Sequence, residues 1–183
     1  MTGDARRSLI DAFRTYAIRE GEFRLSSGGT SNWYLDGRQV TFRGDLQPVI
    51  GQAVLDTLDA AGVGEFDAVG GMTLGADPVA IAVATAKGIR AFSVRKEPKG
   101  HGVGGRFAGP VTADDRVLIV EDTVTTGSAF LMAVDAVTEL GCEIVAAVCL
   151  LDRGGVVGEK LAARGIDFHA VLGAPDVGYP FGS

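Results

Sequence analysis

Apolar residues along the chain change their spacing several times, and these changes predict alternating strands and helices. Runs too short for a helix predict buried strands over residues 68–69, 91–94, 117–120, 144–151 and 168–172. Apolar residues three to four positions apart predict helices over 45–62, 78–86, about 130–137 and 158–163. Asp45 is expected to cap the first of these helices and Gly62 to end it. Such alternation is typical of an α/β fold, a central, mostly parallel sheet flanked by helices.

The first 40 residues or so follow a less regular pattern. Apolar residues from Leu9 to Ala17 share one helical face, and Gly21 is expected to end that helix. Short alternating runs at 23–25 and 33–35 predict two strands. We therefore expect residues 1–183 to form a single domain, in which about residues 1–40 contribute a small N-terminal hood over the main body.

Residues 121–129, after the strand predicted at 117–120, form the most informative segment. Two acids, Glu121 and Asp122, are followed by a Thr-rich turn, a Gly-Ser pair and a helical pattern. The free N–H groups and the dipole at a helix start favour an anion such as phosphate. Since like charges repel, the two carboxylates must serve a neighbouring part of the ligand, either sugar hydroxyls or a cation.

Three further loops lie where a parallel sheet binds ligands, beyond the carboxyl ends of its strands. Residues 95–110 carry four cations and His101 among glycines without any period, as expected of a basic lid over a polyphosphate. Gly100, Gly102 and Gly105 match a dinucleotide fingerprint, but no helix follows them, and the chain has no Walker sequence. Glycines at 70–71 and Arg153 mark the other two loops.

The bulk composition excludes several classes of partner. A net charge of −6 argues against nucleic acid and anionic membranes, and no apolar run approaches the roughly 20 residues that span a bilayer. The N-terminus has no apolar segment resembling a signal peptide. Cys142 and Cys149 match no metal or redox motif, so we expect two reduced thiols in a cytoplasmic protein.

The segment from Glu121 to Ser128 resembles the phosphoribosyl-diphosphate (PRPP) motif of type I phosphoribosyltransferases. Within that family the chain is similar to the orotate-specific enzymes over nearly its whole length. Three further segments show this similarity. Phe23-x-Leu25-x-Ser27-Gly28 with Ser31, Tyr34 and Asp36 resembles the hood motif, and Arg95-Lys96-x-x-Lys99-x-His101-Gly102 resembles the catalytic loop. Leu151-Asp152-Arg153 resembles the orotate-contacting segment. The resemblance implies transfer of the 5-phosphoribosyl group from PRPP to orotate, giving orotidine 5′-phosphate and diphosphate in pyrimidine biosynthesis.

The same resemblance implies roles for individual residues. Lys99, His101 and Asp122 would be catalytic, and Thr125 and Arg153 would contact orotate. The residues implied to bind PRPP are Arg95, Lys96, Lys99, His101, Glu121, Asp122, Thr123, Val124, Thr125, Thr126, Gly127, Ser128 and Ala129. Mg²⁺ is the implied cofactor, with no residue assigned as its ligand, and a homodimer that shares the catalytic loop across subunits is the implied assembly.

Two departures from the family pattern involve three positions. Many members carry Lys where Ser26 stands and a Tyr-Lys pair where this chain has Leu74-Gly75. We expect altered binding of diphosphate and orotate without loss of activity. The alternatives are a type I phosphoribosyltransferase for another base, a PRPP-sensing regulator without turnover, and a simple nucleotide-binding module.

Overall fold

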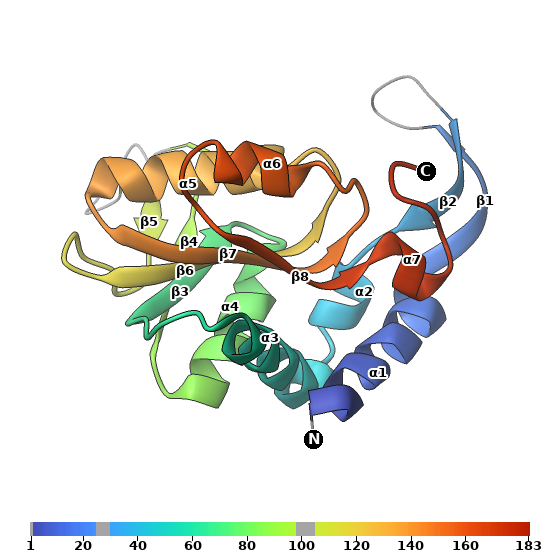
Figure 1. Ribbon diagram of the computed structural model, residues 1–183, viewed down its shortest axis with the longest axis horizontal. Helices are drawn as coiled ribbons and strands as arrows, with labels where there is room; N and C mark the ends of the chain where they lie inside the picture. The colour runs from blue at the N-terminus through green and yellow to red at the C-terminus, as the bar shows by residue number, and fades with distance from the viewer. Residues whose placement is uncertain (1, 25–29, 98–104) are drawn as a thin grey trace.

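A six-stranded sheet lies between two layers of helices in the computed structural model, which describes residues 2–24, 30–97 and 105–183 (Figure 1). The strand order is β5-β4-β3-β6-β7-β8, and only β5 runs antiparallel to its neighbour. The strands are β3 (Ala68–Met72), β4 (Arg90–Val94), β5 (Phe107–Ala108), β6 (Arg116–Val124), β7 (Glu143–Asp152) and β8 (Phe168–Gly173). The predicted α/β class with a mostly parallel sheet is confirmed.

Helices cover both faces of the sheet and enclose one apolar core on each side. The helices are α1 (Thr2–Ala12), α2 (Arg38–Thr41), α3 (Gln47–Ala61), α4 (Ala76–Lys87), α5 (Ser128–Leu140), α6 (Val157–Ala162) and α7 (Ala174–Val177). Figure 1 shows α5 and α6 on one face and α1, α3 and α4 on the other. Among the described helices, none has the length and apolar character that a membrane crossing requires.

A separate hairpin of β1 (Ile18–Arg24) and β2 (Thr30–Leu35) stands at one end of the molecule (Figure 1). We call it the hood. The preceding helix is α1 continued by a π-helical turn, Phe13–Ala17, and β1 begins directly afterwards. The expected stop at Gly21 is therefore wrong, because that glycine lies inside β1.

Three other boundaries differ from the sequence predictions. Asp45 does not cap α3; it lies in a short 3-10 turn, Gly44–Leu46, and pairs with Arg43 at 2.9 Å. β6 continues through Glu121 and Asp122, so the acids lie within the strand instead of after it. β3 likewise continues through the glycines at 70 and 71.

Close packing explains why glycines occupy the middle of β3. A Cβ on Gly71 would lie 2.1 Å from the main-chain oxygen of Val120, and one on Gly70 would lie 2.4 Å from that of Phe92. These positions need glycine because neighbouring strands approach too closely for a side chain.

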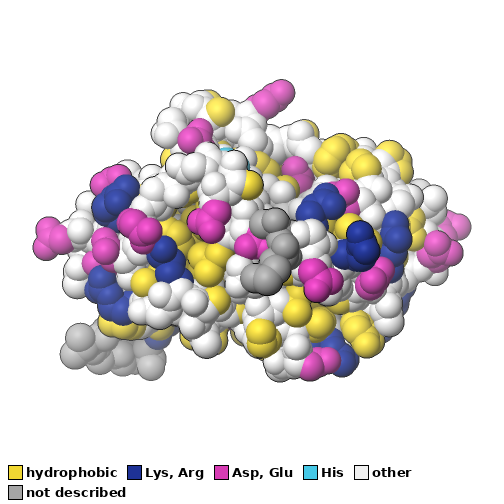
Figure 2. Space-filling view, turned by 60° about the horizontal axis from the view of Figure 1, so that its bottom comes forward, with side chains coloured by type: hydrophobic (Ala, Val, Ile, Leu, Met, Phe, Trp, Pro, Cys, Tyr) yellow, Lys and Arg dark blue, Asp and Glu magenta, His cyan; other side chains and the backbone are white. Residues whose placement is uncertain are grey.

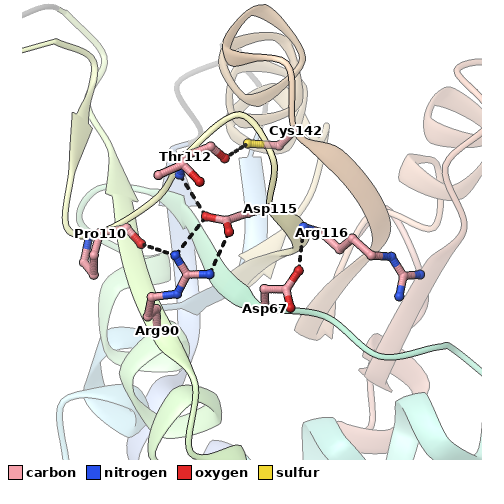
Figure 3. A network of polar contacts seen from close by, with 7 residues as sticks. All are labelled: Asp67, Arg90, Pro110, Thr112, Asp115, Arg116 and Cys142. Carbon is pink, nitrogen blue, oxygen red and sulfur yellow. Dashed lines mark hydrogen bonds and ion pairs between the residues drawn. The ribbon is translucent and has the colours of Figure 1, made fainter.

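A polar network joins the amino ends of β3, β4 and β6, opposite the edge where ligands are expected (Figure 3). The buried carboxylate of Asp115 accepts hydrogen bonds from Arg90 at 2.6 and 3.2 Å and from the Thr112 N–H at 2.8 Å. Although burial raises its pKa, these donors hold the pKa of Asp115 below its usual value. Asp67 accepts from the Arg116 N–H, so both acids fix strand starts.

Candidate active site

A cavity of about 360 Å³ opens at the carboxyl ends of β3 and β6, between the sheet and the segment that follows the hood. Its lining comes from five segments of the chain and consists of Tyr34, Leu35, Asp36, Gly37, Arg38, Met72, Thr73, Leu74, Gly75, Lys96, Glu121, Asp122, Thr123 and Ala129. The edge of the sheet predicted to bind ligands is thus where this cavity lies.

The carboxyl groups of Glu121 and Asp122 are buried side by side in the floor of this cavity. Burial first, and the neighbouring Asp122 charge second, raise the pKa of Glu121 to about 9. Burial also raises the pKa of Asp122, against the Thr123 N–H that donates to its Oδ1 at 2.7 Å. Two like charges held in this way need an external cation or hydroxyl donors to ionise fully.

Two glycines press the backbone against these carboxylates. A Cβ on Gly75 would lie 2.6 Å from Glu121 Oε1, and one on Gly37 would lie 2.8 Å from Asp122 Oδ2. Gly75 is also one of the three positions that depart from the family pattern, and a longer side chain here would displace the acids. Both carboxylates also line the cavity, so a ligand bound there can reach them.

The carboxylates of Glu121 and Asp122 fit a divalent cation that takes most of its ligands from water and substrate phosphates. Among the residues that the structure describes, no group of three or more His, Cys, Asp or Glu side chains could enclose a metal ion. Mg²⁺ commonly keeps several waters and binds one or two carboxylates together with substrate phosphates. Glu121 and Asp122 fit that mode, since they supply two adjacent carboxylates whose ionisation a cation would favour.

A second cavity, of about 240 Å³, lies at the start of α5, immediately beyond β6. Among the described residues, its lining is one consecutive run that begins in the sequence motif and ends just after it, namely Thr123, Val124, Thr125, Thr126, Gly127, Ser128, Ala129 and Phe130. Gly127 has a left-handed backbone, φ 79°, and the hydroxyls of Thr126 and Ser128 are 3.0 Å apart. A 13-residue helix that opens on hydroxyls and free N–H groups suits a phosphate.

The loop after β4 is only partly described. Arg95 holds its two ends together, because its N–H donates to the Arg106 oxygen at 2.7 Å and its Nη1 donates to the oxygens of Gly105 and Phe107. Lys96 lines the first cavity. Lys99 and His101, expected to be catalytic, lie outside the described residues, as does Ser26.

The loops that carry Thr125 and Arg153 are in contact. The Arg153 N–H donates to the Val124 oxygen at 2.8 Å, and a Cβ on Gly154 would lie 1.8 Å from the Thr125 oxygen. Thr125 is exposed, whereas Arg153 is buried and turns its guanidinium toward the hood, where Nη2 donates to Ser31 Oγ at 2.9 Å. The structure thus groups both residues, although Arg153 does not line either cavity.

Arg38 is a cavity residue that sequence reasoning missed. Its guanidinium is half exposed and makes two hydrogen bonds to Asp36, at 2.7 and 3.2 Å, which lower the pKa of that carboxyl. Along the sequence, Arg38 lies beyond the hood motif and outside any periodic segment. Nothing in the sequence therefore distinguished it from an ordinary charged residue on the surface. The segment 72–75, which includes a cis peptide between Thr73 and Leu74, also lines the cavity.

The charges on the face shown in Figure 2 are mixed: Lys and Arg side chains alternate with Asp and Glu, and no continuous basic surface forms there. This agrees with the net charge of −6 and gives no support to a nucleic-acid interface on that face.

Comparisons with known proteins agree with the site. A family model described as phosphoribosyl transferase domain matches residues 62–169. Orotate phosphoribosyltransferase of Corynebacterium glutamicum is 41% identical over 180 residues, which cover 97% of this chain and 96% of that protein. Orotate phosphoribosyltransferase of Mycobacterium tuberculosis in complex with Fe(III) dicitrate superimposes with a TM-score of 0.85 at 37% identity, covering 96% of this chain and 99% of the other. The same enzyme in complex with PRPP gives a TM-score of 0.81 at 35% identity, with the same coverage.

Proposed function

The chain belongs to the phosphoribosyltransferase family and, within it, to the orotate phosphoribosyltransferases, and from this premise we propose how its residues carry out the reaction. The reaction transfers the 5-phosphoribosyl group of PRPP to orotate and yields orotidine 5′-phosphate and diphosphate, a step of pyrimidine biosynthesis. The observation that carries the proposal is the pair of adjoining cavities, one with buried carboxylates and one at a helix start.

These cavities suit the two ends of a ribose 5-phosphate. The N–H groups and hydroxyls from Thr123 to Ala129 would hold the 5′-phosphate at the start of α5. Glu121 and Asp122 would accept hydrogen bonds from the ribose hydroxyls, which lie next to the bond that breaks. Thr123 lines both cavities, so one ligand can occupy both at once.

Charge stabilisation would supply most of the rate. As the bond between C1 and the diphosphate loosens, positive charge spreads over the ribose ring and negative charge builds on the leaving group. Asp122 lies where the first can be balanced, and Lys96 and Arg38 lie in the same cavity as cations for the second. Lys99 and His101 would add their charge to that of these two side chains. Removing one such preorganised group costs roughly 10²–10³ in rate in comparable sites. Mg²⁺, when bound with the substrate, would neutralise part of the diphosphate charge.

Orotate would enter between the hood and the loops of Thr125 and Arg153. It reacts as an anion, so its ring nitrogen needs little help from a general base. We therefore assign His101 to charge stabilisation. Arg95, whose guanidinium donates to both sides of the loop base, would hold that loop over the diphosphate.

We further propose a homodimer in which the loop of Lys99 and His101 reaches the partner's site. An exposed apolar surface supports this assembly. Phe42, Leu74 and Ile81 are each more than half exposed and line one groove of about 400 Å³. Leu74 also lines the active-site cavity, so a second copy bound to this groove would lie beside the reacting groups.

Two further expectations complete the proposal. Residues 1–183 would form one phosphoribosyltransferase domain to which about residues 1–40 contribute the hood. A cytoplasmic location would suit Cys142 and Cys149, which are both free thiols.

A panel of bases tests the proposal against its nearest alternative. Labelled PRPP and Mg²⁺ would be incubated with orotate, uracil, adenine or guanine, and nucleotide formation measured for each. We expect product with orotate and at least about 100-fold less with any other base, because a site built to bond polar groups rejects a ligand that lacks them. Preferred use of a purine would contradict the proposal.

A further inference from the structure

Residues 178–183 form a strap that crosses the hood and ends on Arg153, close to the hood in Figure 1. The main-chain oxygen of Ser183 accepts hydrogen bonds from Arg153 Nε at 2.9 Å and from Nη2 at 2.6 Å. In the opposite direction, the Gly182 N–H donates to the Arg153 oxygen at 2.9 Å. The strap therefore forms hydrogen bonds with both the main chain and the side chain of this arginine.

Trp33 of β2 contacts the Arg153 guanidinium from the hood side. The Arg153 guanidinium lies over the Trp33 ring, with Cζ 4.3 Å from the centroid. The same ring stacks on Tyr179 of the strap, with centroids 4.1 Å apart and planes 7° from parallel. Its Nε1 donates to the Ser183 oxygen at 3.1 Å and to Ser183 Oγ at 2.8 Å. Trp33 is fully buried, and its ring contacts the guanidinium and the Tyr179 ring together.

The hydrogen bonds leave one edge of the guanidinium available. Arginine has five N–H donors in a fixed planar fork. Nε and Nη2 are held by Ser183, Ser31 and Trp33, whereas Nη1 makes no hydrogen bond within the part of the chain that the structure describes. A guanidinium with one edge bonded to the protein and a further nitrogen without a partner among the described residues is the arrangement expected of an arginine that is set in advance for a ligand.

We propose that Tyr179 and Ser183 of the strap, together with Trp33, are positioning residues that hold Arg153 for the carboxylate and ring oxygens of orotate. The inference rests on the proposed function, since it supplies the reason why Arg153 would need a fixed direction. The strap then sets the affinity for orotate without touching the ribose or the phosphates. Loosening it lets Arg153 sample other rotamers, which must be lost again on binding.

A glycine substitution tests the strap with a close internal control. Gly182 has a left-handed backbone, φ 76°, with open space where a Cβ would lie, so Gly182→Ala would shift the Ser183 oxygen without a clash. Gly165 has φ 71° and equally open space, but lies in the turn between α6 and β8. We expect Gly182→Ala to raise KM for orotate roughly 2- to 10-fold, the factor for ordering one long side chain, with kcat and KM for PRPP within about twofold. Gly165→Ala should change none of the three.

A second pair of variants removes the stack instead. Tyr179→Leu should raise KM for orotate by a similar factor, and Tyr179→Phe, which keeps the ring and loses only the hydrogen bond to Glu20, should restore it. In an Arg153→Ala background, Gly182→Ala should add nothing further, because the group it positions is gone.

The outcomes separate the two proposals. If the unchanged protein turns over orotate but Gly182→Ala and Tyr179→Leu leave its KM unaltered, the strap proposal is wrong and the function stands. Equal rises in KM for orotate and PRPP would also overturn it, since they indicate general loosening. If the unchanged protein does not use orotate at all, both proposals fall together.

Discussion

The ligand-free protein disfavours the ionised form of the Glu121 carboxyl. Its folded-state pKa is about 9, well above the value near 4.5 of an ordinary glutamate. A carboxyl with a raised folded-state pKa contributes stability below its unfolded pKa, and this contribution is lost as the pH rises through the folded value. Between about pH 4.5 and 9, the ligand-free protein is therefore progressively destabilised by this group.

Replacing the carboxyl by an amide tests this. We expect Glu121→Gln to raise the thermal midpoint of the ligand-free protein at pH 9 and to change it little near pH 5, while activity falls. Each kcal/mol corresponds to roughly 2–4 °C for a domain of this size. Glu65→Gln, which also removes one negative charge but from an exposed side chain, is the control. A midpoint difference that does not vary with pH would show that Glu121 is not the titrating group.

Residues of the site differed in how far the sequence could identify them. Glu121, Asp122 and the turn after them were predictable because polar groups at the end of a buried strand have few structural reasons to be there. Lys96 was found through its loop, and the structure places it in the cavity. The partners of Arg153 could not be found, since Ser31 and Ser183 are 122 and 30 residues away and only the folded chain brings them together.

At the scale of elements, α3 and α4 pack so closely that a glycine stands at their contact. A Cβ on Gly51 would lie 2.5 Å from the Ala82 oxygen and 2.9 Å from the Ala86 Cβ. α4 leads directly from the cavity loop, so the position of α4 sets the position of Gly75 and the carboxylates. Helix packing and the site are thereby coupled.

Two glycine-to-alanine changes within helices should have opposite effects. Gly51→Ala should lower the free energy of unfolding by about 1–3 kcal/mol, because the helices must move apart. Gly158→Ala in α6, where a Cβ would have its nearest neighbour at 3.6 Å, should raise it by up to about 1 kcal/mol through helix propensity. Urea unfolding of both variants measures the difference. Equal effects of the same sign would refute the close contact between α3 and α4.

Element prediction succeeded where a period could develop. The long helices and the five parallel strands were predicted, whereas β5, α2 and α7, at two to four residues each, are too short to show one. The glycines of β3 were read as a loop because glycine usually marks one, and the reason for their place in a strand, contact with Val120 and Phe92 of neighbouring strands, is tertiary.

At the scale of the whole molecule, the apolar groove of Phe42, Leu74 and Ile81 is the surface proposed to bind a second copy. We expect Ile81→Glu to convert the protein to a monomer in analytical ultracentrifugation, because the variant would bury a charge at the interface. Turnover should fall at the same time, because each site would lose the loop of Lys99 and His101 that the partner contributes. Val156→Glu places the same charge on an apolar side chain outside this groove and should leave both unchanged. A dimer that survives Ile81→Glu would show that the groove is not the interface.

The central claim is that the two adjoining cavities bind PRPP for attack by orotate. The most direct measurement follows orotate absorbance after PRPP and Mg²⁺ are added to the protein, with diphosphate measured in the same samples and Asp122→Asn as the matched variant. The account predicts one diphosphate for each orotate consumed, and a rate lower by roughly 10²–10³ for Asp122→Asn. Unchanged orotate absorbance with the unmodified protein, or equal rates for the two proteins, would contradict it.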